Sequence, residues 1–312
     1  RLNNNVIVLI GQMEIIASLM VIGFFVQKIK LFDDRLIDSL SAIMSKLILP
    51  CMLITVIGSI SREELFSSWR FFVCSVAAYI VVIAISKFVA IFSGLKEPQR
   101  SMHALLCCFG NSGFIGIPLI VSMFPTSAGI AAASFSLIES TLYWVFGPLL
   151  IKSENGGKKI DIKKIVTPLT ISVIIGFVIV LLDFDFDGFV LWDTVKDVGG
   201  TSKYFASIYI GMNLGRMGIK KVSANMRVFL TAPFKLIIFP VMAYIAVSKI
   251  GALSGDILTM YVVLFATPAG MTLPILANIS GADGDYASAG CMVSTVLCLF
   301  TMPFVIWLTG II

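Results

Sequence analysis

The stretch Gly110-Asn111-Ser112-Gly113-Phe114-Ile115-Gly116-Ile117-Pro118 interrupts an apolar segment that extends over residues 105–124. A second apolar segment, residues 257–279, is interrupted by Thr267-Pro268-Ala269-Gly270-Met271-Thr272-Leu273-Pro274. A helix in the hydrocarbon of a membrane pairs its own backbone polar groups, and a cluster of glycine and proline leaves some of them unpaired. Such interruptions are tolerated where they line a cavity that holds water. The two stretches therefore predict a polar site midway across a bilayer.

The composition is that of an integral membrane protein. Only 13% of the 312 residues are charged, and the mean hydropathy is +1.00, whereas about a quarter of the residues in a soluble domain are charged. A helix needs about 20 apolar residues to cross the hydrocarbon, so the chain has room for about ten crossings. The pattern predicts an all-α fold with helices over residues 6–27, 36–60, 69–92, 101–124, 128–151, 164–182, 198–215, 226–248, 257–280 and 286–310.

The basic residues predict the orientation, because lysine and arginine stay on the cytoplasmic side of a membrane. Alternate connections contain Lys28, Lys30, Arg35, Lys96, Arg100, Lys152, Lys158, Lys159, Lys163, Lys164, Arg216, Lys220, Lys221 and Arg227. We therefore expect the linker 152–163 in the cytoplasm and both termini outside it, with the protein in the cell (plasma or inner) membrane. The lysines of the linker serve as a topological signal, and an additional contact with anionic lipids stays open.

Five predicted helices precede the linker and five follow it. An odd number in each half inverts the second half relative to the first, which is the plan of many secondary transporters. Weak internal similarity supports this arrangement, because Ile117-Pro118-Leu119-Ile120 resembles Leu273-Pro274-Ile275-Leu276. The fourth and ninth helices, which contain the interruptions, then occupy matching positions.

The two interruptions supply the candidate binding residues. Asn111 and Ser112 bring side-chain donors and acceptors into the membrane, and glycine lets a ligand approach the backbone closely. Where a helix begins again after an interruption, its N-terminus favours an anionic group. The predicted substrate-binding residues are Gly110, Asn111, Ser112, Gly113, Thr267, Pro268, Ala269 and Gly270. The alternative interpretation is a pair of kinks at which small residues allow helices to pack closely.

Charged residues inside the predicted helices are the next candidates. Glu139 lies in the middle of the fifth helix, where a carboxylate is expected to be paired, protonated or functional. Since its surroundings decide which protonation state is favoured, it could change protonation during a transport cycle. Lys87 in the third helix is the predicted partner in this coupling or support role, and extension of its ammonium group to the membrane surface is the alternative. For Lys235 we expect extension to the surface or structural pairing.

Motifs for a metal, a cofactor or an enzymatic reaction are not recognisable. The six cysteines lie inside apolar segments without a CxxC pair, and the one histidine, His103, has no ligand cluster around it in the sequence. A nucleophile with a base and a phosphate-binding loop are also missing from the sequence. We therefore expect no metal, no cofactor, no nucleic acid partner and no enzymatic activity.

At the interrupted segments the chain resembles the auxin efflux carrier family, which includes plant auxin exporters and bacterial permeases for malate, malonate and similar acids. The resemblance covers nearly the whole chain, and the stretch 110–119 resembles the interrupted fourth helix of that family. Further matching positions are Leu49-Pro50, Thr167-Pro168-Leu169, Phe239-Pro240, Ala266-Thr267-Pro268-Ala269, Ser294-Thr295 and Met302-Pro303.

The resemblance implies the fold of the bile acid sodium symporters, with ten membrane helices in two inverted five-helix repeats and with broken helices four and nine crossing. Helices one, two, six and seven, residues 1–60 and 164–215, would form a scaffold domain through which a homodimer assembles. Helices three to five and eight to ten, residues 69–151 and 226–310, would form a transport domain that moves like an elevator.

The resemblance also implies roles for particular residues. Asn111 matches the asparagine that meets the substrate carboxylate in plant members. Glu139 stands where those members have glutamine, and Lys87 matches their lysine. Gly110 replaces a proline of the plant members, and an apolar residue replaces their aspartate in helix three.

These features together predict a secondary active transporter of a small organic anion, a carboxylate, with proton linkage. One alternative is a sodium-coupled organic anion symporter, although the second interruption lacks the carboxylate and amide that sodium-coupled relatives place there. The other alternative is a sensor that binds its ligand without transporting it. The expected partners are the organic anion, the lipid bilayer and a second copy of the chain. The identity of the anion and the direction of transport stay open.

Overall fold

The computed structural model describes residues 4–151, 166–184, 186, 188–217 and 219–310. The described part of the chain is helical, and its only extended pairing is one isolated bridge. Six helical segments in it are long and apolar enough to cross a membrane: Ile7–Lys28, Asp34–Gly58, Arg62–Phe92, Ala128–Val145, Met226–Lys249 and Gly284–Thr309. An all-α integral membrane protein is thereby confirmed, and the ten-helix inverted repeat stays a prediction. The linker predicted at residues 152–163 lies outside the described residues.

The first half of the chain forms α1 (Asn4–Lys28), α2 (Asp34–Ile43), α3 (Leu49–Gly58), α4 (Arg62–Ser67), α5 (Trp69–Phe92), α6 (Gln99–Cys108), α7 (Ile117–Met123) and α8 (Ala128–Leu150). The second half forms α9 (Pro168–Leu182), α10 (Val190–Gly200), α11 (Ser202–Met217), α12 (Ile219–Ala224), α13 (Thr231–Pro233), α14 (Phe239–Lys249), α15 (Gly255–Phe265), α16 (Leu273–Ser280) and α17 (Gly284–Thr309). The helices predicted over 101–124 and 257–280 are each divided in two, at the interruptions.

Contacts between residues divide the chain into two discontinuous units. The first unit contains Arg1–Phe72, Gly113–Leu137 and Val166–Arg216, and the second contains Val73–Ser112, Ile138–Ile165 and Met217–Ile312. Each unit combines segments from both halves of the sequence, as the predicted scaffold and transport domains do. The segment Gly113–Leu137 was expected in the transport domain, whereas its contacts are with the first unit. Contacts alone do not test a domain movement, so the scaffold and transport assignments stay a prediction.

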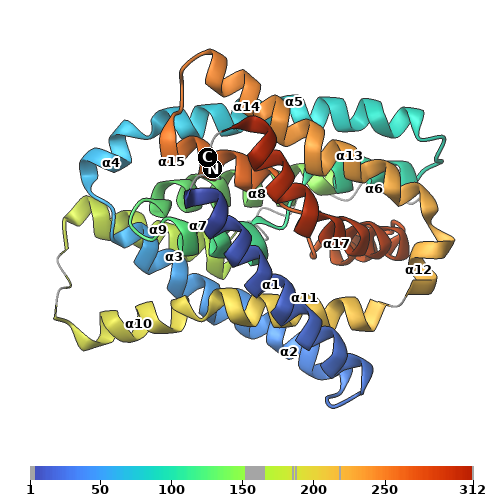
Figure 1. Cartoon of the computed structure of the whole chain (residues 1–312), viewed down its shortest axis with the longest axis horizontal. Coiled ribbons are helices and arrows are strands. Elements are labelled where there is room, and N and C mark those ends of the chain that lie inside the picture. The colour runs from blue at the N-terminus through green and yellow to red at the C-terminus, as the bar shows by residue number, and fades with distance from the viewer. Residues whose placement is uncertain (1–3, 152–165, 185, 187, 218, 311–312) are drawn as a thin grey trace. The chain divides into compact units, whose positions relative to one another are not determined.

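The first unit is built around α3, which packs against α9 and α10 (Figure 1). Glycines allow these helices to approach closely, as at Gly176, where a Cβ would lie 2.7 Å from the Cβ of Ile57. Helices α1 and α11 approach even more closely. A Cβ at Gly23 would overlap the carbonyl oxygen of Ile208, and one at Gly211 would overlap that of Met20. Small residues at helix contacts are typical of packing in membranes.

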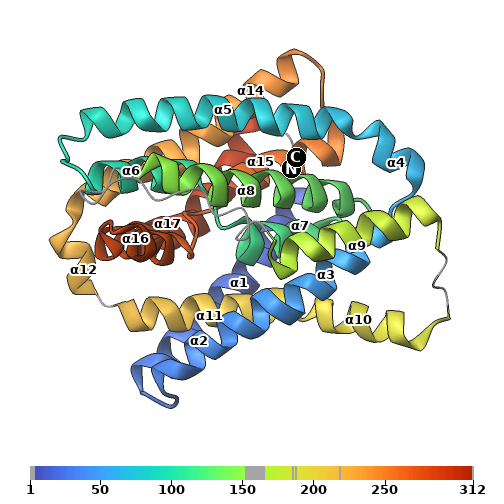
Figure 2. The same ribbon diagram turned by 180° about the vertical axis from the view of Figure 1, so that it is seen from behind.

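The second unit is built around α17. This helix contacts α6, α12, α14, α15 and α16, and Figure 2 shows α16 lying along it. The unit therefore gathers around one long helix the helix before the first interruption, α6, and the helices on both sides of the second, α15 and α16.

Prolines shape three helical segments in the same way. Pro50, Pro118 and Pro240 each occupy the second position of an α-helix that directly follows a π-helical turn. Those turns are η1 (Met44–Ile48), η2 (Ser112–Gly116) and η5 (Phe234–Ile238). Proline has no N–H, and its ring displaces the carbonyl group of the preceding turn. The wider π-helical turn accommodates this displacement, so the helical segment bends and continues.

Gly23→Ala should destabilise the protein, because the added Cβ would overlap the backbone of α11. Overpacking of this kind costs about 1–3 kcal/mol, which thermal melting of the purified protein would register as a lower melting temperature. Gly11→Ala is the matched control on the same helix, since nothing lies within 4 Å of its Cβ position. Equal melting temperatures for the two variants would contradict the close packing of α1 and α11.

Candidate functional site

The two interruptions meet backbone to backbone within the second unit. The N–H of Asn111 donates to the carbonyl oxygen of Pro268 at 2.7 Å, and the N–H of Gly270 donates to that of Phe109 at 3.2 Å. Gly110 and Ala269 thereby form an isolated antiparallel bridge. An interrupted helix leaves backbone groups unpaired in the membrane. Here each interruption provides hydrogen-bond partners for several such groups of the other.

The local sequence explains why the chain is extended at these points. Residues 109–111 and 266–272 lie outside helices. A helical segment resumes at Ser112 and α16 begins at Leu273. Proline at position 268 disfavours a helical conformation of the residue before it, and glycine at positions 110 and 270 tolerates a close backbone approach.

Gly110 has no room for a side chain. A Cβ there would overlap the hydroxyl oxygen of Thr267, and it would lie 3.1 Å from Lys235 Nζ and 3.3 Å from Glu139 Oε1. A Cβ at Gly270 would lie 2.8 Å from the carbonyl oxygen of Gly110. The bridge therefore requires glycine at both positions, and it has a cation and a carboxylate directly beside it.

Glu139 in α8 accepts hydrogen bonds from three donors. The hydroxyl of Tyr79 donates to Oε1 at 2.7 Å, and the N–H of Gly110 donates to the same oxygen at 2.9 Å. The hydroxyl of Ser112 donates to Oε2. The residue is only 7% exposed, and a buried polar group of this kind is expected to be paired. The carboxylate thus joins α5, α8 and the first interruption.

The cation next to this carboxylate is Lys235 and not the predicted Lys87. Lys235 lies in the π-helical turn before α14, is 3% exposed, and donates from Nζ to the carbonyl oxygen of Phe265 at 3.3 Å. Extension of Lys235 to the surface is therefore wrong, and structural pairing is what the structure shows. Lys87 instead lines a pocket together with Leu149 of α8. Leu149 lies about 15 Å along α8 from Glu139, at a rise of 1.5 Å per residue.

Helix α17 supports the second interruption. The hydroxyl of Ser294 accepts the N–H of Ala269 at 3.0 Å. The thiols of Cys291 and Cys298 donate to the carbonyl oxygens of Gly270 and Ala266 at 3.1 and 3.5 Å. These bonds use backbone groups of the second interruption that do not take part in the bridge, and so hold this segment against α17.

The side-chain amide of Asn111 is the group of the site that is available to bind a ligand. Asn111 is 4% exposed, and its Nδ2 has no hydrogen-bond partner among the described residues. A buried donor without a partner calls for an explanation, such as a bound ligand or water. The structure thus brings together all of the predicted binding residues except Gly113, which follows in the next helical segment with nothing within 4 Å of its Cβ position.

Sequence reasoning missed Tyr79 and did not connect Lys235 with Glu139. Lys235 does carry a signal, because it is a charged residue in the middle of a predicted span. Tyr79 carries none, since a tyrosine in an apolar helix is equally typical of lipid contact.

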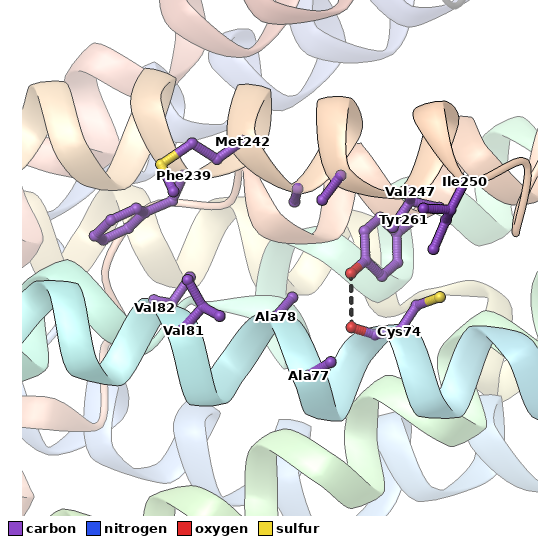
Figure 3. A pocket seen from close by; sticks show the side chains of 12 residues that line it. Cys74, Ala77, Ala78, Val81, Val82, Phe239, Met242, Val247, Ile250 and Tyr261 are labelled. Atoms are coloured by element: carbon purple, nitrogen blue, oxygen red, sulfur yellow. Dashed lines mark hydrogen bonds between the residues drawn. The ribbon is translucent and has the colours of Figure 1, made fainter.

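A separate hollow of about 190 Å³ lies between α5 and α14 (Figure 3). Its walls include Ala77 and Val81 of α5 with Phe239 of α14, and none of its described lining residues is charged. The hydroxyl of Tyr261 donates to the carbonyl oxygen of Cys74 at 2.9 Å at one end of it. An apolar lining of this kind does not suit an anion.

Comparisons with known proteins identify the family of the chain. A family model described as a membrane transport protein matches residues 8–306. A Rhizobium meliloti (strain 1021) protein named "Putative malonate transporter" is 20% identical over 300 residues, which are 93% of this chain and 92% of that protein. A Methanothermobacter thermautotrophicus protein named "Uncharacterized transporter" is 26% identical over 203 residues, which are 62% of this chain and 63% of that protein. Because the family match extends over nearly the whole chain, the chain belongs to the family of membrane transport proteins that its interrupted helices resemble, the auxin efflux carrier family.

Proposed function

We propose that this protein is a secondary active transporter of a small organic anion, a carboxylate such as malonate, in the cell membrane. Membership in the family supports the transport activity. The observation that carries the substrate class is the buried, unpartnered amide of Asn111 beside the bridged interruptions. The name of the Rhizobium relative is consistent with a dicarboxylate.

The binding chemistry follows from the groups around the bridge. A carboxylate oxygen would accept a hydrogen bond from Asn111 Nδ2, and the ammonium group of Lys235 would attract the negative charge. Glu139 balances this ammonium group while the site is empty. Helix α16 begins directly after the second interruption, so its N-terminus favours an anion in the same place.

The transport step would use the second unit as a carrier. This unit contains the whole bridge together with Asn111, Glu139 and Lys235. A movement of the unit would therefore carry the bound anion together with the groups that bind it. We propose that this movement is elevator-like, that the scaffold helices form a homodimer, and that both termini lie outside the cytoplasm.

Asn111→Ala should lower the apparent affinity for carboxylates about 10- to 150-fold, because it removes a hydrogen bond to a charged group worth about 1.5–3 kcal/mol. Asn111→Asp should be at least as damaging, because it replaces the donor with a second negative charge. The measurement is the transport current of proteoliposomes on a solid-supported membrane, with a panel of mono- and dicarboxylates, with and without sodium.

Asn278→Ala is the matched control, since Asn278 lies exposed on α16. An unchanged response of the Asn111 variants would remove this residue from the site. Currents that require sodium would favour the sodium-coupled alternative, and binding without current would favour a sensor.

Glu139→Gln should remove the pH dependence of transport, because the variant keeps an acceptor for Tyr79 and Gly110 but has no proton to gain or lose. The same currents, recorded over a pH range in which the carboxyl groups of the substrate stay ionised, measure this effect. Lys46→Gln is the control, since Lys46 is another charged residue within a predicted membrane helix but is exposed. A pH dependence as steep as that of the unaltered protein would exclude Glu139 as the proton-sensitive group.

A further inference from the structure

Another hollow in the second unit is polar, unlike the one between α5 and α14. It lies where α5 ends, α6 begins and α8 ends. It has a volume of about 370 Å³, and its polar lining is Lys87, Glu97, Arg100 and Ser101. Ile91 lines it one residue before the end of α5, and Leu150 lines it at the end of α8. We call it the α5–α6–α8 pocket. Since it lies where two long apolar helices end, it is placed at the level where these helices leave the hydrocarbon.

The pocket holds a surplus of positive charge. Glu97 is engaged, because one oxygen accepts from Arg100 Nε at 2.9 Å and the other accepts from the N–H of Ser101 at 3.1 Å. Partial burial acts to raise the pKa of Glu97, but its hydrogen bonds from Ser101 and Arg100 outweigh this and hold the pKa below the ordinary value. Glu97 is therefore ionised at neutral pH and balances Arg100. Lys87 is the remaining charge.

Lys87 is free to bind a ligand. Its side chain is exposed, and within the described residues its ammonium group has no hydrogen bond or ion pair. The guanidinium group of Arg100 uses only Nε towards Glu97, so its terminal nitrogens keep donors for a second acceptor. A phosphate group suits this pair, because it accepts several charge-assisted hydrogen bonds.

The surface beside the pocket is apolar and exposed. Phe88 and Ile91 of α5 are 61% and 59% exposed, and Leu149 of α8 is 50% exposed. Exposed side chains of this size on membrane-spanning helices contact lipid tails. A ligand that fits both the charges and this surface therefore has an anionic head and apolar chains.

We propose that the α5–α6–α8 pocket binds an anionic glycerophospholipid, with its phosphate at Lys87 and Arg100 and its acyl chains along Ile91 and Leu149. The connection that contains Lys96 and Arg100 is predicted to lie in the cytoplasm, so the lipid comes from the cytoplasmic leaflet. This site is separate from the bridged interruptions and does not depend on which substrate the protein carries. It assigns Lys87 a role in lipid binding in place of the predicted contact with Glu139.

Native mass spectrometry of the delipidated protein in detergent tests this site. Phosphatidylglycerol should bind more tightly than phosphatidylcholine with the same acyl chains. Lys87→Gln should weaken phosphatidylglycerol binding about fivefold, as expected for one basic side chain at a charged membrane surface, and should leave phosphatidylcholine binding unchanged. Lys87→Arg keeps the charge and should keep the preference.

Lys96→Gln is the matched control, since Lys96 lies exposed in the same connection but does not line the pocket. Equal binding of the two lipids, or an equal loss in the Lys96 and Lys87 variants, would overturn the proposal. Glycerol phosphate supplies the same headgroup chemistry without acyl chains. Displacement of phosphatidylglycerol by an equal concentration of glycerol phosphate would assign the pocket to a soluble anion and overturn the lipid assignment.

Discussion

The pairing of two backbone segments inside the membrane is the interaction on which the rest of the site depends. Backbone N–H and C=O groups in the interior of a bilayer need partners, and the segments around Gly110 and Ala269 provide them for each other. Because of this pairing, two helices can be interrupted next to each other without a large cost in stability. It also requires that side chains be absent at Gly110 and Gly270, because each would meet the opposite segment.

The charges near the bridge follow from the same constraint. A single buried charge would be unfavourable, whereas Glu139 and Lys235 both lie close to the Cβ position of Gly110 and each is bound to backbone as well. The network satisfies several polar groups of the interruptions and leaves Nδ2 of Asn111 without a partner among the described residues. A site that is complete except for one donor and has a buried cation nearby is suited to an anion that arrives and leaves.

The sequence was sufficient for the positions of the interruptions and for most of the residues that meet at the bridge, because glycine, proline and asparagine stand out in apolar segments. It was not sufficient for the partner of Glu139. Lys87 and Lys235 are both charged residues in predicted spans, and hydropathy does not tell which side of a helix faces the protein. Packing decides this: Lys235 is buried beside Phe265, whereas Lys87 is exposed at the end of α5. Likewise, tertiary packing decides that the segment Gly113–Leu137 belongs to the first unit, and the sequence alone does not show this.

The most direct test of the account is an experimental map of the protein in lipid nanodiscs with a bound dicarboxylate such as malonate. The account predicts extended backbone at Gly110 and Ala269, paired through Asn111 and Pro268. It also predicts density for the ligand within hydrogen-bond distance of Asn111 Nδ2. Continuous helices through both segments, or ligand density remote from the paired backbones, would contradict it.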